Sequence, residues 1–271
     1  MARLFKAFFF KIARDLTFRI TLIVGGAFAI FTCLLYFFLD KSTCTGPNMI
    51  VNTFTPVNNF GIAVPVNLIS FTVLEFTQGT IRNKIIAGNS KFKIYLSLFL
   101  TGIIFTLSLI IVYAAICTIF GGIVGGFDLE KSRVTVNMMF PASVTVKYLI
   151  QLIVIYFFVF VFLTSFAIFS ATLFRNIGPC IPLVVGVLFL GALLPVFLYG
   201  HIEPNSPAEW ILKIFDPFYG ITGATISGVD AEHISAFFED STFISAIASN
   251  IVYAGALFAG GAILFVKRDV K

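Results

Sequence analysis

The chain has 271 residues, of which 59% are hydrophobic and only 11% are charged, and its mean hydropathy is +1.02. Soluble domains carry about 25% charged residues, so this composition excludes an ordinary soluble protein. The net charge of +5 is best explained by membrane topology and contact with anionic lipid, and we expect no binding to nucleic acid.

Residues 1–15 predict an amphipathic helix that lies in the membrane interface. On a helix turning 100° per residue, the basic and apolar side chains fall mostly on opposite arcs. The basic arc is Arg3, Lys6, Lys11 and Arg14, and the other is Leu4, Phe5, Phe8 and Ile12. We expect the aromatic face to enter the headgroup boundary. The alternative is a plain basic anchor before the first span.

Six apolar segments are long enough to cross a bilayer core of about 30 Å at about 1.5 Å per helical residue. They are continuous rather than alternating, which favours helices over the strands of a β-barrel. The segments are Thr17–Leu39, Val57–Phe76, Ile94–Gly121, Val146–Phe174, Ile177–Gly200 and Phe243–Val266. The sequence therefore predicts an all-α integral membrane protein with six transmembrane helices in one domain, residues 1–271.

The basic residues set the predicted orientation. If six spans alternate, thirteen of the 18 Lys and Arg residues fall on one side and five on the other. The richer side is cytoplasmic by the positive-inside rule, so both termini are expected there, in a bacterial plasma membrane. Pro56, Pro65 and Asn67 interrupt the second segment. Were that segment re-entrant, Lys271 would lie outside, which the charge distribution disfavours.

The segment 77–93, together with Glu75, is a charged island between the second and third spans. Thr80 is expected to cap a short helix, and Gly88 to end it in a left-handed conformation. Ile81, Ile85 and Ile86 would form an apolar strip along that helix. A soluble partner with a hydrophobic groove could grip such a strip. The alternative is an interfacial hairpin that only links two spans.

An acidic segment, residues 201–242, precedes the last span. It holds seven carboxylates and a single lysine, Lys213. Residues 208–215 are amphipathic and 218–226 are apolar, and Trp210 fits an interfacial anchor. These features predict an external re-entrant helical cap, and a solvated acidic loop is an equal alternative. Among the cysteines Cys33, Cys44, Cys117 and Cys180, only Cys44 is expected in an external loop.

Catalytic chemistry has little support in the sequence. No Gly-Lys pair occurs, so there is no phosphate-binding P-loop. The two histidines, His201 and His233, are far from any cysteine, which leaves metal binding and a Cys-His pair unsupported. Span interiors lack carboxylates that could couple ions, and Asn67, Gln151 and Asn250 are interpreted as helix–helix contacts. We therefore expect neither a catalytic residue nor a metal site.

The island carries a resemblance. The pattern Glu75, Gly79-Thr80-Ile81, Gly88-x-Ser90 and Ile94-Tyr95-Leu-Ser97, placed between a second and a third span, resembles the permease subunits of ABC-2 type exporters. The six spans, the basic N-terminal helix and the acidic cap are similar as well, so the resemblance covers nearly the whole chain. It implies that the island is a coupling helix that docks on a separate ATPase. On this reading Glu75, Gly79, Thr80, Ile81, Ile85, Ile86 and Gly88 couple the chain to that partner.

The same resemblance implies the partners. Two copies of an ABC ATPase subunit would bind ATP and Mg, two permeases would pair around the path, and this chain would hold no cofactor itself. The acidic cap favours release of cationic cargo, which suggests an amphipathic or antimicrobial-type peptide, or a similar hydrophobic substrate. The rivals are a secondary transporter or channel and a membrane scaffold that transports nothing. The residues that line the path, and whether the permeases are identical, are left open.

Overall fold

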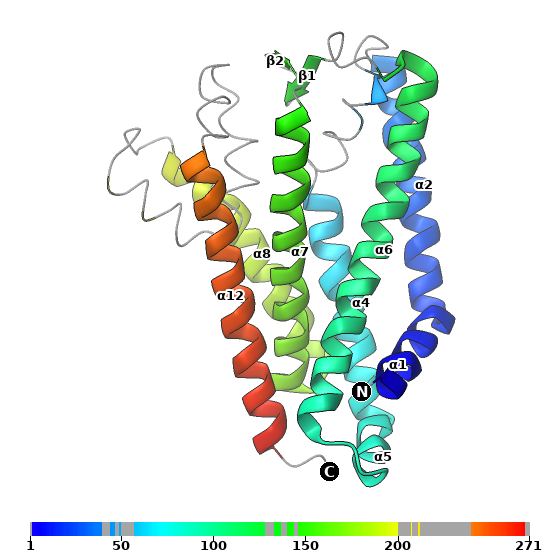
Figure 1. Ribbon diagram of the computed structural model, residues 1–271, viewed down its shortest axis with the longest axis vertical. Helices are drawn as coiled ribbons and strands as arrows, with labels where there is room; N and C mark the ends of the chain where they lie inside the picture. The colour runs from blue at the N-terminus through cyan, green and yellow to red at the C-terminus, as the bar shows by residue number, and fades with distance from the viewer. Residues whose placement is uncertain are drawn as a thin grey trace.

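The computed structural model describes residues 2–39, 44–46, 49, 57–127, 133–136, 140–143, 146–199, 207, 211 and 240–268. The long helices run side by side as a bundle (Figure 1). The helices are α1 (Ala2–Arg14), α2 (Leu16–Leu39), α4 (Val57–Thr77), α5 (Thr80–Ile86), α6 (Lys91–Gly125), α7 (Val146–Phe174), α8 (Ile177–Tyr199) and α12 (Asp240–Lys267).

A short β-hairpin adds to the helical fold. Strands β1 (Arg133–Val136) and β2 (Phe140–Ser143) pair antiparallel, with Arg133 opposite Ser143. The hairpin connects α6 to α7 at the end of the bundle remote from α5 (Figure 1). The apolar segments of the sequence predict only helices. Four-residue strands are too short to give a clear alternating pattern, although the Val-Thr-Val run has the β-branched composition of a strand.

Four segments of the described chain are long and apolar enough to cross a membrane: Leu16–Leu35, Lys91–Gly125, Ile153–Phe174 and Phe243–Lys267. Within their described side chains, α4 and α8 contribute the shorter apolar stretches Ala63–Thr77 and Ile177–Leu190. The apolar helices support a membrane-associated protein of all-helical type. Among the described residues, four helices rather than the expected six therefore meet this length and composition.

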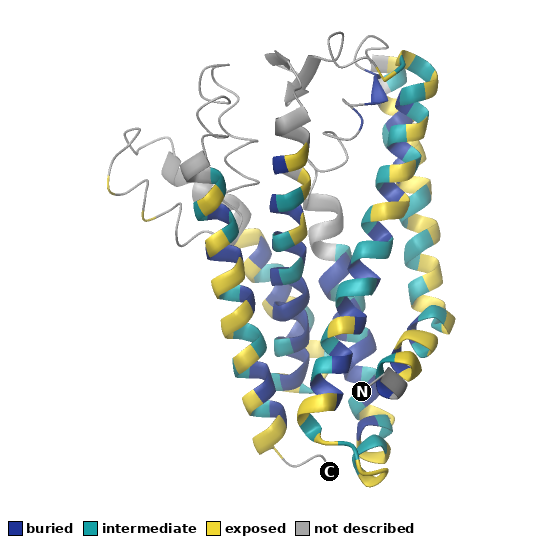
Figure 2. Cartoon of the chain, in the orientation of Figure 1, coloured by how far each residue is buried: buried dark blue, intermediate teal, exposed yellow. Residues whose placement is uncertain are grey.

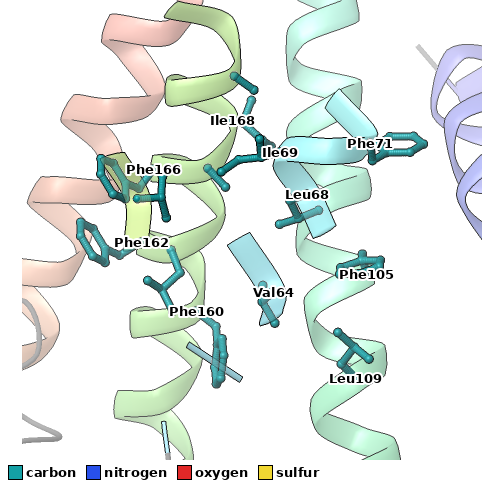
Figure 3. Packing of buried hydrophobic residues seen from close by; sticks show 14 of the residues in the cluster. Val64, Leu68, Ile69, Phe71, Phe105, Leu109, Phe160, Phe162, Phe166 and Ile168 are labelled. Carbon is teal, nitrogen blue, oxygen red and sulfur yellow. The ribbon is translucent and has the colours of Figure 1, made fainter. Parts of the chain in front are cut away.

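The core of the bundle forms where α4, α6 and α7 meet. Val64 and Leu68 of α4 lie between the helices that carry Phe160 and Phe105 (Figure 3). Leu68 is 1% exposed, and Phe105 and Phe160 are buried as well. The outer face of α2, by contrast, is largely exposed (Figure 2). In a membrane protein such an apolar surface suits contact with lipid or with another chain.

Polar side chains inside the bundle mostly form hydrogen bonds between helices or with backbone carbonyls of their own helix. The Thr21 hydroxyl donates to Asn67 Oδ1 at 2.8 Å, which links α2 to α4 and confirms the interpretation of Asn67. Asn250 donates to the carbonyl of Ala246 in its own helix at 2.8 Å. Pro65 lies inside α4, which continues through it from Val57 to Thr77. The second apolar segment is therefore one helix and not an interrupted one.

The small residues near the end of α6 pack against a loop. A Cβ placed on Gly121 would approach the Thr45 carbonyl oxygen to 2.7 Å, and one on Gly125 would meet the Cys44 carbonyl. These glycines therefore pack against residues 44, 45 and 49 rather than against a neighbouring long helix. Cys44 is fully buried. The sequence predicts Cys44 in a loop, and this loop residue is covered because its backbone packs against Gly125 of α6.

Candidate functional site

The candidate site lies where α5 joins α4 to α6, beside α1 and at the same end of the bundle as the end of α12 (Figure 1). We call its charged centre the Glu75 cluster, which consists of Phe8 and Lys11 of α1, Glu75 of α4, Gln78 after α4 and Lys84 of α5. They bring α1 together with α4 and α5, which follow each other directly and are distant from α1 in sequence. The cluster therefore fixes how these helices meet.

Glu75 is fully buried near the end of α4. Its Oε1 lies 2.6 Å from Lys11 Nζ, and its Oε2 lies 2.9 Å from Lys84 Nζ. A buried carboxylate without a partner would be very unfavourable, whereas two ammonium groups at these distances compensate its desolvation. Glu75 thus ties α4 to α1 on one side and to α5 on the other.

Lys84 is held by an aromatic ring as well as by Glu75. Its Nζ lies 3.1 Å from the centroid of the Phe8 ring, a cation–π contact between α5 and α1. Burial lowers the pKa of Lys84, the hydrogen bond and charge of Glu75 oppose that effect, and the charge of Lys11 adds to the lowering. Lys11 also donates to Gln78 Oε1 at 3.2 Å. The ammonium group of Lys84 thus contacts both α1 and α4, and that of Lys11 contacts Glu75 and Gln78.

Two glycines bracket α5. Gly79 (φ 67°) and Gly88 (φ 84°) both adopt the left-handed region that favours glycine. Gly88 ends the helix as expected. The expectation that Thr80 caps the start was wrong, because Gly79 occupies the N-cap position without any side-chain cap bond and Thr80 is the first helical residue. Ser90 does cap α6, accepting a hydrogen bond from the Lys93 backbone N–H at 3.4 Å.

The three isoleucines of α5 do not form one exposed strip. Ile81 is fully buried and Ile85 is half-buried against the core of the same chain, whereas Ile86 is 73% exposed. Arg82 is exposed beside Ile86, and Phe92 at the start of α6 is 48% exposed. Ile81 therefore attaches α5 to the bundle. The surface that a partner could reach consists of Arg82, Ile86 and Phe92, which we call the α5 tip.

The N-terminal helix turns its apolar face toward the protein. Leu4, Phe8 and Ile12 are buried, and α1 packs on α6. The helical periodicity of residues 1–15 had favoured lipid headgroups as the cover of this face, and the structure places protein there instead. Periodicity shows that a helix has an apolar face, but it does not show whether protein or lipid covers that face.

A second set of basic residues joins helix ends near α5. Lys91 Nζ donates to the carbonyl oxygens of Val266 and Arg268, both at 3.0 Å. The Arg268 guanidinium in turn donates to the Leu173 carbonyl oxygen. The Arg175 guanidinium lies 5.3 Å from the centroid of the Phe76 ring. Cations at the carboxyl ends of helices satisfy terminal carbonyls and complement the helix dipole, and here they link α6 to α12 and α12 to α7.

Sequence reasoning identified Glu75 but missed its partners. In the sequence, Lys11, Lys84, Lys91 and Arg268 indicate only which side of the membrane is cytoplasmic. A carboxylate at the end of an apolar span is itself a signal, since it needs a cation once it is buried. The expected cap, residues 201–242, lies almost wholly outside the described residues.

The site consists of charged and aromatic contacts that join α1, α4 and α5. In the described ranges, no three His, Cys, Asp or Glu side chains gather closely enough to hold a metal ion. The short helix α5 lies between two left-handed glycines, Gly79 and Gly88, and Lys84 connects it to α4 and α1. Comparison of this chain with protein-family models, with curated proteins and with solved structures gives no match.

Proposed function

We propose that this chain is the membrane-spanning permease subunit of an ATP-driven exporter of the ABC-2 type. The observation that carries the proposal is α5, which stands at one end of the bundle with Arg82 and Ile86 exposed while Ile81 and Lys84 attach it inward. A short amphipathic helix in this setting suits the groove of a soluble partner. The six long helices would each cross the membrane once.

The charge distribution supports a cytoplasmic position for this end. Five basic side chains lie at this end and make the contacts described above: Lys11, Lys84, Lys91, Arg175 and Arg268. Basic residues concentrate on the cytoplasmic side of membrane proteins. On this basis α5 would face the compartment that supplies ATP. Two ATPase subunits would bind ATP and Mg and would contact the α5 tips of two permeases.

The Glu75 cluster would pass movement of α5 into the membrane. A displacement of α5 changes the position of Lys84, which contacts Glu75 of α4 and the ring of Phe8 in α1. Because α4 also packs against α7 in the core, such a displacement would reach the centre of the bundle. The cargo class remains the amphipathic peptide or similar hydrophobic substrate named above.

The experiment tests the exposed isoleucine of α5. The chain is co-expressed with a candidate ATPase, one whose sequence carries Gly-x-x-x-x-Gly-Lys-Ser/Thr, and the complex is purified by an affinity tag on the permease. We expect Ile86→Asp to remove most of the co-purified ATPase, since it places a charge in an apolar groove at a cost of several kcal/mol. Transport should fall in parallel while the permease still inserts.

The matched control is Ile211→Asp, the same change at an isoleucine that is 57% exposed between α8 and α12. It should leave the ATPase bound. Ile81→Asp is unsuitable for this purpose, because Ile81 is buried and its loss would disturb folding. Normal ATPase recovery and normal transport with Ile86→Asp would refute docking at the α5 tip. ATP-independent flux through the purified chain would favour a secondary transporter or channel instead.

A further inference from the structure

The face of α1 that points away from the protein combines aromatic and basic side chains. Phe9 is 44% exposed and Phe10 is 54% exposed, on the side opposite the buried residues Leu4, Phe8 and Ile12. Lys6 and Arg14 are exposed on the same side of the helix. An amphipathic helix in water would not present two adjacent phenylalanines without a reason, because exposed apolar patches mark contact surfaces.

The cations lie close to these rings. The Arg14 guanidinium carbon lies 4.0 Å from the centroid of the Phe10 ring. Arg19, in the first turn and a half of α2, reaches back so that its Nε donates to the Ala13 carbonyl oxygen at 3.3 Å. Both guanidinium groups are therefore held at the level of α1. We call Lys6, Phe9, Phe10, Arg14 and Arg19 the outer face of α1.

The outer face continues into a surface that is suited to lipid. Asp15 accepts a hydrogen bond from the Thr17 backbone N–H at 2.7 Å and so starts α2 directly after α1. Along α2, Leu16, Ile20 and Ile23 are 71%, 49% and 71% exposed. Because α2 is long and apolar enough to cross a membrane, its start places α1 at the level of the lipid headgroups.

We propose that the outer face of α1 binds the surface of an anionic phospholipid bilayer. Phe9 and Phe10 enter the headgroup boundary, and Lys6, Arg14 and Arg19 contact lipid phosphates. Charge complementarity selects anionic lipid, since Lys6, Arg14 and Arg19 are exposed, Arg14 lies over the Phe10 ring, and the carboxylate of Asp15 is engaged in capping α2. The inference depends on the membrane-spanning character of α2 and is independent of ATP-driven export.

A single tryptophan at the proposed contact reports which lipid lies beside it. The native Trp210 is replaced by phenylalanine and Phe10 by tryptophan, which keeps an aromatic ring under Arg14. The full chain is reconstituted in two sets of vesicles that contain equal amounts of phosphatidylcholine and phosphatidylglycerol. In one set only the phosphatidylglycerol is brominated, and in the other only the phosphatidylcholine is brominated. Fluorescence is quenched only by bromine in neighbouring acyl chains. No ATPase partner is needed.

We expect brominated phosphatidylglycerol to quench F10W more strongly than brominated phosphatidylcholine, with an enrichment of up to about fivefold for each contributing cation. K6Q combined with R14Q should reduce this preference, whereas R82Q at the α5 tip should leave it unchanged. Tryptophan at Ile23, on the exposed apolar face of α2, should be quenched equally by both lipids and shows that the chain lies in the bilayer.

Two results would overturn the proposal. Equal quenching of F10W by both lipids would remove the selectivity for anionic headgroups. Absence of quenching at F10W, while tryptophan at Ile23 is quenched normally, would mean that a protein surface such as a second copy covers α1. Either result would leave the proposed export function open, because that function is tested at Ile86.

Discussion

Replacement of Glu75 by glutamine removes the carboxylate that joins three helices at the end of the bundle. The amide has nearly the same shape, so the packing of α4 is preserved. Lys84, whose side chain is only 15% exposed, then keeps its charge against the Phe8 ring but loses its anionic partner. We expect a large loss of stability that is concentrated at α1 and α5.

The size of this loss follows from the two distances. With an effective dielectric constant of about 20, each contact at 2.6 Å or 2.9 Å has a Coulomb energy of roughly 6 kcal/mol. Desolvation of the buried charges cancels much of this energy, and the Lys11 contact is further screened because that side chain is 38% exposed. Removal of one partner from a buried ion pair typically costs about 3–5 kcal/mol.

A double-mutant cycle measures the interaction free energy between Glu75 and Lys84 separately from the effect of each single substitution. Thermal unfolding of the purified protein in detergent is measured for Glu75→Gln, Lys84→Met and the double variant. Glu75→Gln should lower Tm by on the order of 10 °C. Adding Lys84→Met should restore part of the loss, because the stranded ammonium is removed, so the two changes should be non-additive by at least about 1 kcal/mol.

Lys93→Met is the matched control, since Lys93 is an exposed lysine at the start of α6. It should leave Tm nearly unchanged. If Glu75→Gln were as mild as Lys93→Met, or if the cycle were additive within about 0.5 kcal/mol, then the Glu75–Lys84 contact would not be a significant source of stability. The mechanical link proposed between α5 and α4 would fail with it.

Burial lowers the pKa of Lys84 below its usual 10.5. Between the lowered value and 10.5, the unfolded chain therefore binds more protons than the folded chain does. The free energy of unfolding should rise with pH in that window. Tm measured from neutral to alkaline pH should show this rise in the wild type and a weaker rise in Lys84→Met. Gly261→Ala should destabilise by about 1–3 kcal/mol, because its Cβ would lie 2.9 Å from Tyr95 Cζ and closer still to the hydroxyl; Tyr95→Phe should relieve part of that loss in a double variant. In intact cells, an impermeant thiol reagent should leave the buried Cys44 unmodified, and a cysteine at Arg82 should react only after the membrane is opened. Labelling at position 82 from outside would reverse the assigned orientation.

The sequence predicted the long helices well because hydrophobic length alone defines them. The expected segment Val146–Phe174 coincides with α7, and α8 runs over Ile177–Tyr199 where Ile177–Gly200 was expected. Local chemistry also located the left-handed stop at Gly88. These features depend on a few neighbouring residues, which a sequence shows directly.

Contacts between distant segments could not be read in the same way. Nothing in the local pattern shows that Lys11 reaches Glu75, or that Lys91 reaches the carbonyl of Val266. The cap at Thr80 was misplaced because a left-handed Gly79 can start a helix without any side-chain bond. The apolar face of α1 was assigned to lipid because the spacing of apolar residues is the same whether a protein surface or a bilayer covers them.

The two left-handed glycines also determine how α5 responds to heat or denaturant. Gly79 and Gly88 interrupt the helical backbone on both sides, so the orientation of α5 depends on the side chains of Ile81 and Lys84 rather than on a continuous hydrogen-bonded rod. Seven residues alone are too few to persist as a helix in water. Loss of the Lys84 contact should therefore release α5 as a unit that opens while the bundle stays folded, and the amide protons of Asn83 and Ala87 should exchange with solvent well before those of α7.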